Sequence, residues 1–405
     1  MVKIAIIGFG VVGSGVYEVL RKNAADIAVN AATEIDIKYI LDIRDFSSHS
    51  ESHLFVNDVN TIANDEEVEI VVETMGGLEP ANSFTRLCLE KGKSVVTSNK
   101  ELVATYGDEL FGLAQKNNCK YFYEASVGGG IPIIRPLSKC LAANRIDKIA
   151  GILNGTTNYI LTRMFSDNAS FESALKEAQE KGYAEKDPTA DVEGFDTGKK
   201  ICILSSMING EKIDHRDVHT EGITKITAED TEYASKFNSV IKLIGLCERV
   251  SDKYEVVVAP MLVGNESPLY GVDDVFNGIM VSGNMLGDAL FYGRGAGKLP
   301  TASAVVADVI DIAKNKNDKF IAPWTSSKEN VLVPYEKITT SMYVRVESDD
   351  VAKAVDYIEK AFKGDIKCEI SCGEFAFITP LDTIENINRN LSGIPGTVLS
   401  QLMVL

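Results

Sequence analysis

The first thirteen residues constrain the fold of this chain more than any other stretch. Residues Val2 to Ile7 are apolar apart from Lys3, which is typical of a strand at the centre of a parallel sheet covered on both faces. The segment GFGVVG at residues 8–13 follows at once, and an amphipathic helical pattern continues through Val19 and Leu20. A strand, a glycine-rich turn and a helix in this order predict an α/β domain that binds a dinucleotide.

The glycine-rich turn would supply the contacts with the phosphates of the dinucleotide. In this Rossmann fingerprint the first glycine permits a tight turn, the second lets the backbone approach the pyrophosphate, and the third lets the helix pack on the strand. The helix N-terminus adds N–H groups and the positive end of a dipole. The predicted cofactor-binding residues here are Gly8, Phe9, Gly10, Val11, Val12 and Gly13.

The end of the second predicted strand, Ile35 to Leu41, leaves the choice of cofactor open. Asp42 follows this strand, and an acid at this position usually holds the ribose hydroxyls of NAD. Arg44 comes two residues later, and an arginine there accepts the 2′-phosphate of NADP. The next residues, FSSHSES, bring no further Lys or Arg. NAD and NADP therefore both remain candidates, with NADP slightly favoured.

Three further strands are expected to end at the same edge of the sheet. Glu69 to Glu73 runs into the turn TMGG, the segment SVVTSNK at residues 94–100 leads into a helix at Lys100, and Tyr121 to Ala125 precedes a glycine-rich turn. The carboxyl ends of parallel strands form the ligand crevice of such sheets. Lys100 is therefore a candidate functional residue, although an exposed lysine at a helix start remains the alternative.

A dense acidic stretch lies in the middle of the chain, between Gly182 and Lys200. The apolar positions from Ile201 to Ile208 predict a buried helix, so Asp196 and Lys200 would lie one turn apart near its N-terminus. A charge run is usually only a solvated face. A lysine that becomes buried, however, can be tuned to donate a proton. Lys200 and Asp196 are therefore candidate catalytic residues.

The remaining segments predict an α+β second domain. A short strand at Gly151 to Leu153 precedes a polar loop at Asn154 to Asn158, whose amides and hydroxyls suit a small polar ligand. A helix is expected near Phe237 to Leu246 and a strand at Tyr254 to Val258. A glycine-rich turn at Tyr292–Thr301 and a helix at Ala302–Ala313, packed back on the first domain, would complete it.

The last part of the chain predicts a separate module. Residues 314–337 are polar and irregular and are expected to form a linker. From Ser341 onward the pattern predicts strand, helix, strand, strand, helix and strand, which is the ferredoxin-like βαββαβ order. The expected elements are Ser341–Val346, Val351–Phe362, Ile366–Ser371, Glu374–Ile378, Leu381–Leu391 and Thr397–Val404.

Composition and charge argue against several classes of partner. The net charge of −17 argues against nucleic acid or an anionic membrane as the main partner. No segment approaches the roughly 20 apolar residues needed to span a bilayer. The apolar N-terminus fits a strand and turn better than a signal peptide. The 7 cysteines are scattered and indicate reduced thiols, so we expect a cytoplasmic protein with a small-molecule substrate.

Taken in order, these landmarks resemble those of the homoserine dehydrogenase family over nearly all of residues 1–313. The resemblance rests on GFGVVG (8–13), ETMGG (73–77), VTSNKELV (96–103), YEASVGGGIP (123–132), NGTTNY (154–159), GYAEKDPTADVEGFD (182–196) with Lys200, and GRGAGKLPT (293–301). The family interconverts L-aspartate 4-semialdehyde and L-homoserine with NAD(P)H, in threonine, methionine and isoleucine biosynthesis. The resemblance implies the same hydride transfer for this chain.

The resemblance also implies a role for each candidate residue. Lys200 would donate the proton to the oxygen that gains charge, Lys100 would be the second catalytic lysine and a cofactor contact, and Asp196 would orient Lys200. Carboxylates suit the substrate ammonium, and amides and hydroxyls suit its other polar groups. The implied substrate-binding residues are Glu185, Asp191, Asn154, Gly155 and Thr156, and Gly297 would contact the cofactor.

A monovalent cation is a further implication, because the family binds one, usually sodium, in the turn after Glu124. The matching ligands are the carboxylate or carbonyl of Glu124 and the carbonyls of Val127, Gly129 and Ile131. Hard oxygen atoms in a glycine-rich turn make this site plausible. Without the resemblance, a plain hinge between domains remains the alternative.

The domain boundaries follow from the same comparison. Residues 1–130, with a returning helix at about 296–316, would form the NAD(P)-binding domain, 131–295 the catalytic and dimerisation domain, and 317–337 the linker. Residues 338–405 look like the regulatory ACT domain of many family members. Here ESDDV at 347–351 replaces the expected acidic-Pro-Gly-apolar turn. Threonine feedback is therefore not expected, and the module would serve in the association of a homodimer or higher homo-oligomer.

Two other functions are compatible with parts of this pattern. A related Rossmann oxidoreductase could act on another small carbonyl compound, but it would need a different ammonium site, and Glu185 is present. A non-catalytic, nucleotide-dependent regulatory protein would be expected to lack the lysine pair, yet both Lys100 and Lys200 are present. The sequence therefore favours an active dehydrogenase.

Overall fold

A parallel sheet forms the first part of the computed structural model, which describes residues 1–405 except 328, 363–365 and 372. Its strand order is β3-β2-β1-β4-β5-β6, and each neighbouring pair in this order is parallel. This order confirms the prediction of a Rossmann-type domain with β1 at the centre. The strands are β1 (Val2–Ile7), β2 (Ile35–Leu41), β3 (Phe55–Val56), β4 (Val68–Glu73), β5 (Ser94–Thr97) and β6 (Tyr121–Phe122).

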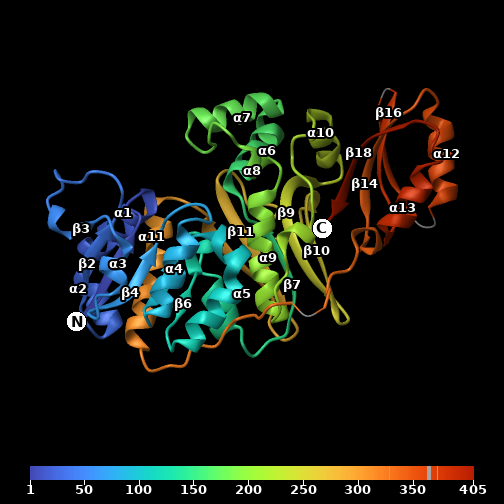
Figure 1. Ribbon diagram of the computed structural model, residues 1–405. Coiled ribbons are helices and arrows are strands. Elements are labelled where there is room, and N and C mark those ends of the chain that lie inside the picture. The colour runs from blue at the N-terminus through green and yellow to red at the C-terminus, as the bar shows by residue number, and fades with distance from the viewer. Residues whose placement is uncertain (328, 363–365, 372) are drawn as a thin grey trace. The chain divides into compact units, whose positions relative to one another are not determined.

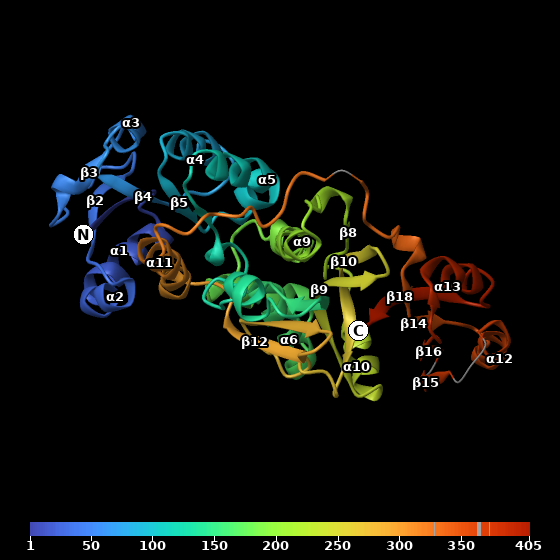
Figure 2. The same cartoon turned by 90° about the horizontal axis from the view of Figure 1, so that it is seen from below.

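Helices cover both faces of this sheet (Figures 1 and 2). One face carries α1 (Val11–Lys22), α2 (Ala24–Ala31) and α11 (Lys298–Lys314), and the other carries α3 (Val59–Ala63), α4 (Ala81–Glu90) and α5 (Lys100–Lys116). Helix α11 returns from far along the chain to pack on α1, where Gly15 leaves room for Ala302. Burial on both faces explains why β1 is apolar at nearly every position.

The strand expected at Tyr121 to Ala125 is shorter than predicted. Strand β6 ends at Phe122, and a short 3-10 helix, η2, occupies Glu124–Ser126. The Glu124 N–H donates to the Asp308 carboxylate of α11 at 2.9 Å instead of to a neighbouring strand. A side-chain acceptor on a distant helix therefore ends the strand, and the apolar pattern alone could not reveal this.

A mixed sheet organises the second part of the chain. Its order along the main path is β12-β11-β7-β9-β10-β18-β14-β16-β15, and β8 pairs with β10. Helix α6 packs on one face of β9 and β11, and the start of α9 packs on the other face against Gly245. The elements before the C-terminal module are β7 (Ile146–Ile152), α6 (Gly155–Asp167), α7 (Phe171–Glu180), α8 (Thr189–Val192), α9 (Phe195–Asn209), β8 (His219–Thr220), α10 (Ala228–Lys236), β9 (Ser239–Val250), β10 (Lys253–Gly264), β11 (Phe276–Gly283) and β12 (Gly287–Arg294).

Two predictions for this region are wrong. The segment expected to be a helix, Phe237 to Leu246, lies mostly in strand β9, because an apolar run, here interrupted by Lys242, is also typical of a strand buried on both faces. The polar loop expected at Asn154 to Asn158 is the start of α6, with Asn154 as its N-cap: the side chain accepts the Thr157 N–H at 2.9 Å.

The glycine-rich turn expected at Tyr292–Thr301 is shorter than predicted, since β12 extends to Arg294 and α11 begins at Lys298.

The C-terminal module has the predicted βαββαβ order. Its strands are arranged β18-β14-β16-β15, with the two helices on one face (Figure 1). The elements are β14 (Met342–Glu347), α12 (Val351–Ala361), β15 (Lys367–Ser371), β16 (Glu374–Ile378), α13 (Ile384–Leu391) and β18 (Thr397–Val404), and the short strands β13 (Thr339–Thr340) and β17 (Asp382–Thr383) pair with each other. Strand β18 also pairs in parallel with β10, so this module extends the sheet of the second part.

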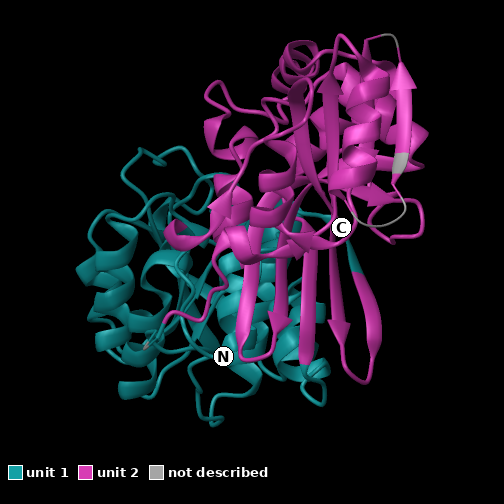
Figure 3. Cartoon of the chain, turned by 90° about the vertical axis from the view of Figure 1, so that its right-hand side faces the viewer, with its two compact units in different colours: residues 1–145, 202–215, 291–329 teal, residues 146–201, 216–290, 330–405 magenta. Residues whose placement is uncertain are grey.

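The chain divides into two compact units, coloured separately in Figure 3. One comprises Met1–Arg145, Cys202–His215 and Phe291–Glu329, and the other comprises Ile146–Ile201, Arg216–Leu290 and Asn330–Leu405. Helix α9 contributes to both. Among the described residues, no helix has the length and apolar character to cross a membrane. Six of the cysteines are free thiols, and the seventh, Cys372, lies outside the described residues.

Candidate active site

The glycine-rich turn after β1 has the geometry that a bound pyrophosphate requires. Gly8 adopts a φ of +90°, which L side chains rarely adopt, and a Cβ on Gly13 would lie 1.9 Å from the Gly8 carbonyl oxygen. A Cβ on Gly10 would meet nothing within 4 Å, so the backbone there is open to a ligand. Helix α1 begins at Val11 without a side-chain cap, leaving its first N–H groups available for phosphate. These residues therefore fit a dinucleotide.

The end of β2 joins an acid and a base. The Asp42 carboxylate accepts the Phe9 N–H at 2.8 Å and two guanidinium N–H bonds of Arg44, at 2.9 and 2.8 Å. The guanidinium beside it holds the pKa of Asp42 well below its usual range. The Asp42 side chain is 7% exposed and that of Arg44 is 57% exposed. The surface presented to a cofactor is therefore a guanidinium supported by a buried carboxylate.

Three polar residues at the ends of β4 and β5 were not singled out from the sequence. Glu73 is 1% exposed, and its carboxylate accepts the Thr97 hydroxyl at 2.5 Å and the Met75 N–H at 2.7 Å. Burial raises the pKa of Glu73 to about 7. Asn99 caps α5, whose first residue is Lys100, by accepting the Leu102 N–H at 3.1 Å. The sequence did contain one signal for this group: Glu73 is an acidic residue at the end of a mostly apolar strand.

The turn after η2 is built around the Glu124 carboxylate. It accepts the N–H groups of Ile133, Ile134 and Arg135 at 2.6, 2.8 and 2.9 Å. The Arg135 side chain also contacts this carboxylate at 3.2 Å and Asp308 at 3.4 Å. Burial raises the pKa of Asp308 to about 8. The oxygens of the Glu124 side chain are thus already occupied by N–H donors.

The turn after η2 is a tightly packed stretch of backbone with buried main-chain carbonyls. Gly129 has a φ of +56°, and a Cβ there would lie 2.2 Å from the Gly295 carbonyl oxygen. Val127 and Ile131 are 1% and 2% exposed. Across the described ranges, the hydrogen bonds of this turn do not end on the carbonyls of Val127, Gly129 or Ile131. Buried carbonyls of this kind gain from a hard cation.

A lysine and an acid lie one turn apart at the start of α9, as predicted. The Lys200 Nζ donates to Asp196 Oδ2 at 2.8 Å and to the Leu153 carbonyl at 2.7 Å. The side chains of Lys200 and Asp196 are 9% and 4% exposed. A buried ammonium is stable only beside such partners. The acidic stretch therefore contributes a desolvated ion pair and is more than a solvated surface.

Asn154 connects this ion pair to a second acid. Its side-chain amide donates to Asp196 Oδ2 at 2.9 Å and to Asp191 Oδ1 at 2.7 Å. The Thr156 hydroxyl donates to the Tyr183 carbonyl at 2.6 Å, which ties α6 to the acidic stretch. A Cβ on Gly155 would lie 2.8 Å from the Val275 carbonyl oxygen. The cluster of Asn154, Asp191, Asp196 and Lys200, called the lysine cluster below, is one hydrogen-bonded unit.

The other predicted residues lie outside the lysine cluster. Glu185 is exposed, and its main-chain carbonyl accepts a hydrogen bond from the Gln179 side-chain amide at 3.1 Å. Lys100 begins α5, and Gly297, with a φ of +123°, precedes α11; both belong to the other compact unit. Among the described residues no group of three or more His, Cys, Asp or Glu side chains is arranged to hold a metal ion.

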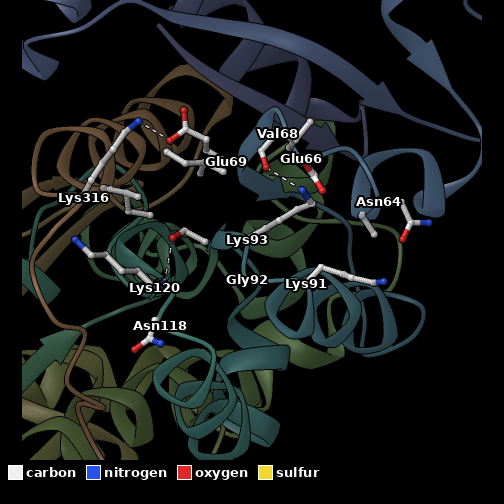
Figure 4. A pocket seen from close by; sticks show the side chains of 14 residues that line it. Asn64, Glu66, Val68, Glu69, Lys91, Gly92, Lys93, Asn118, Lys120 and Lys316 are labelled. Carbon is white, nitrogen blue, oxygen red and sulfur yellow. Dashed lines mark hydrogen bonds and ion pairs between the residues drawn. The ribbon is translucent and has the colours of Figure 1, made fainter.

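A cavity of about 510 Å³ lies at the opposite, amino-terminal ends of β4 and β5 (Figure 4). Its lining includes four lysines, but Lys316 is paired with Glu69, and Lys93 points to the main-chain carbonyl of Val68 at 2.9 Å. Ligands of open α/β sheets bind at the carboxyl ends of the strands. This cavity is therefore separate from the dinucleotide turn and from the residues around Lys100.

The Rossmann unit and the buried lysine fit the class of NAD(P)-dependent oxidoreductases that act on a CH–OH group. Family models agree with this class. The model described as homoserine dehydrogenase, NAD binding domain, matches residues 8–124, and the homoserine dehydrogenase model matches residues 132–310. The chain therefore belongs to the homoserine dehydrogenase family.

Individual relatives support the assignment over most of the chain. Homoserine dehydrogenase from Neisseria gonorrhoeae is 41% identical over 358 residues, covering 86% of this chain and 82% of the relative. The Bacillus subtilis enzyme is 36% identical over 370 residues, covering 89% and 84%. A solved homoserine dehydrogenase from Thiobacillus denitrificans superposes with a TM-score of 0.90 at 34% identity, covering 100% of this chain and 98% of that one. The resemblance inferred from the motifs is thereby confirmed.

Proposed function

We propose that this chain interconverts L-homoserine and L-aspartate 4-semialdehyde, with Lys200 as the proton donor to the carbonyl oxygen. The observation that carries this proposal is the buried contact of Lys200 with Asp196 and the Leu153 carbonyl. In the reducing direction the aldehyde oxygen gains negative charge, which an ammonium beside it stabilises and then neutralises by giving up a proton. Asp196 keeps the lysine charged and oriented until that transfer.

The substrate would be held by groups of opposite sign to its own charges. The proposed ammonium site consists of Glu185 and Asp191, and the polar atoms of Asn154, Gly155 and Thr156 complete it. Asp191 is supported in this role by its contact with the Asn154 amide, which also reaches Asp196. Binding the amino-acid end through the same network that holds Lys200 would fix the distance between the ammonium site and the proton donor.

The cofactor would bind at the turn Gly8, Phe9, Gly10, Val11, Val12 and Gly13, with Lys100 and Gly297 as further contacts. Lys100 is also proposed as the second catalytic lysine, beside Lys200. NAD(P)H supplies the hydride when bound. The open backbone at Gly10 and the uncapped start of α1 support this site. We propose Arg44 as the partner of the 2′-phosphate of NADP, because its guanidinium is the exposed member of the Asp42–Arg44 pair. A hyperthermophilic archaeal homoserine dehydrogenase, 28% identical, has been solved in complex with NADPH.

A sodium ion is proposed at the turn after η2. The ligands would be the carbonyls of Glu124, Val127, Gly129 and Ile131, and not the Glu124 carboxylate, since that group already accepts three main-chain N–H bonds. Four carbonyl oxygens suit a hard monovalent cation. The role proposed for the ion is to rigidify the turn.

The domain roles are also proposals. We assign residues 1–130 and about 296–316 to cofactor binding, 131–295 to catalysis and dimerisation, 317–337 to a linker and 338–405 to an ACT-like module. The turn 347–351 is held internally, since the Ser348 hydroxyl donates to the Pro395 carbonyl at 2.6 Å and Asp350 caps α12. This supports a role in association and not in threonine binding; strong inhibition by threonine would contradict it.

Dimerisation is supported by exposed apolar side chains on the hairpin at the edge of the mixed sheet. Met285 and Leu286 in the turn are 81% and 45% exposed, and Leu290 on β12 is 39% exposed. A homodimer or larger homo-oligomer would cover this edge. A monomer in sedimentation at micromolar concentration would contradict this. The free thiols are compatible with the reducing cytoplasm, which we propose as the location.

The experiment that tests the proposed reaction is an assay of homoserine oxidation with NAD and NADP in parallel. We expect reduction of the cofactor that depends on homoserine and is stronger with NADP. Absence of turnover with both cofactors, in protein that binds NADPH, would contradict the proposed substrate.

A further inference from the structure

Glu73 joins two loops that follow neighbouring strands. It is the last residue of β4 and is 1% exposed. One carboxylate oxygen accepts the Met75 N–H at 2.7 Å in the turn TMGG, and the other accepts the Thr97 hydroxyl at 2.5 Å at the end of β5. A single side chain therefore fixes the chain beyond β4 to the chain beyond β5.

Thr97 continues this link to the start of α5. Its hydroxyl oxygen accepts the Asn99 N–H at 2.9 Å. Asn99 in turn donates from its amide to the Gly77 carbonyl at 2.7 Å and caps α5 through the Leu102 N–H. Lys100 is the first residue of that helix. Its backbone position therefore depends on the hydrogen bonds that begin at Glu73.

The other end of the link reaches the dinucleotide turn. The Thr74 hydroxyl donates to the Gly8 carbonyl at 2.8 Å, and the Thr74 N–H donates to the Ile7 carbonyl at 2.9 Å. A Cβ on Gly8 would also lie 3.0 Å from Met75 Cγ. The turn that would receive the pyrophosphate thus contacts the same TMGG segment that Glu73 holds.

We propose that Glu73 is a positioning residue that couples the dinucleotide turn to Lys100 through Met75, Thr97 and Asn99. The proposal rests on the role given to Lys100 in the proposed function. The side-chain hydrogen bonds of Glu73 go to Met75 and Thr97, which are not among the predicted substrate or cofactor residues, so Glu73 acts through Thr97 and the TMGG turn.

The cost of burying this carboxyl supports a specific role. The groups that act on it are the Thr97 hydroxyl, the Asn99 amide, the Met75 N–H and the Tyr121 phenol, whose own pKa burial raises well above its usual range. Burial raises the pKa of Glu73 to about 7. An apolar residue would fill the same space without this cost. A hydrogen-bonding function that an apolar side chain cannot perform explains why a carboxyl occupies the position.

The test uses one disruptive and one conservative substitution at each end of the link. Glu73→Met removes the acceptor, and Glu73→Gln keeps an acceptor for Met75 and can donate to Thr97. Thr97→Val removes the hydroxyl, and Thr97→Ser keeps it. NADPH affinity by fluorescence and kcat for homoserine oxidation are measured for each. Thr85→Val is the matched control, because Thr85 is a buried threonine (1% exposed) on α4 of the same unit.

Glu73→Met should weaken NADPH binding and lower kcat, each by about tenfold, because both loops lose their support. Thr97→Val should lower kcat by about tenfold while NADPH affinity changes less, since the dinucleotide turn keeps its contacts with Thr74. The conservative variants and Thr85→Val should remain within about threefold of the wild type. Normal kcat and affinity in folded Glu73→Met, or in Thr97→Val if the former does not fold, would overturn the proposal.

Lys100→Ala separates this proposal from the proposed function. If Lys100→Ala turns over normally, the role assigned to Lys100 fails. If Lys100→Ala is impaired but Thr97→Val and Glu73→Met are not, only the coupling through Glu73 fails.

Discussion

The ammonium of Lys200 lies 2.8 Å from the carboxylate of Asp196, one helical turn before it on α9. Both side chains are less than a tenth exposed. Because little water reaches them, each charged group is stabilised mainly by the other. Asn154 contacts the same carboxylate oxygen, which connects the pair to Asp191. Removing one member of such a pair leaves an uncompensated buried charge, which makes the pair a direct target for substitution.

Asp196→Asn should lower kcat by at least about tenfold while NADPH affinity stays within about twofold. The amide keeps the shape of the side chain but not the charge that stabilises the Lys200 ammonium. Steady-state kinetics and a fluorescence titration with NADPH measure the two quantities. Glu193→Gln is the control, since Glu193 belongs to the same acidic stretch but contacts Thr224. Equal kinetics for Asp196→Asn and Glu193→Gln would contradict the proposal that Asp196 orients Lys200.

Arg44→Ala should lower kcat/KM for NADP by about tenfold or more and leave the value for NAD within about threefold. The variant loses the proposed phosphate partner and exposes the Asp42 carboxylate, which repels a phosphate. Both cofactors are compared in the same assay, with Lys22→Ala as a control that removes an exposed basic residue from the adjacent helix α1. Equal losses for NAD and NADP would show that Arg44 does not distinguish them.

The fold of the N-terminal unit was predictable because its strands are buried on both faces. β1 and β2 follow the predicted residues, and α5 begins at Lys100 as expected. The same property made the prediction for β9 wrong, since the run from Val240 to Cys247 is apolar apart from Lys242 and has no clear period. Burial on both faces removes the alternation that separates a strand from a helix.

The site was predictable where a contact is local and not where it depends on strand pairing. Asp196 and Lys200 are four residues apart, so helical spacing alone brings them together. Glu73 and Thr97 are 24 residues apart and meet only because β4 pairs with β5 in the register that places them opposite each other. No property of either residue in the sequence indicates that partner.

Removal of sodium should lower the melting temperature as well as the activity. Dialysis into choline chloride of equal ionic strength removes the sodium ion proposed to bind the carbonyls of Val127, Gly129 and Ile131. A site filled to about ten times its Kd contributes about 1.4 kcal/mol, so a decrease of roughly 2 °C is expected by differential scanning fluorimetry. Restoring NaCl should reverse it. The same melting temperature in both salts would contradict a sodium site.

Glu73 should make the stability of the protein depend on pH. Burial raises its pKa from the usual 4.5 to about 7, so the folded chain holds this proton more tightly than the unfolded chain. The free energy of unfolding therefore falls as pH rises from 4.5 to 7 and levels off above, by about 3 kcal/mol for this group. Urea unfolding at pH 5 and pH 8 should show that loss in the wild type relative to Glu73→Gln. Parallel pH dependence of the two proteins would contradict the assignment.

The most direct test of the account is the rate of hydride transfer in Lys200→Met, measured in a single turnover with saturating NADPH and aldehyde. Methionine fills the space of the lysine stem without a charge or a proton. We predict a loss of at least about 100-fold, with NADPH affinity unchanged and with Lys199→Met, the neighbouring lysine, close to the wild type. A transfer rate within a few-fold of the wild type in folded Lys200→Met would contradict the central claim that Lys200 is the proton donor.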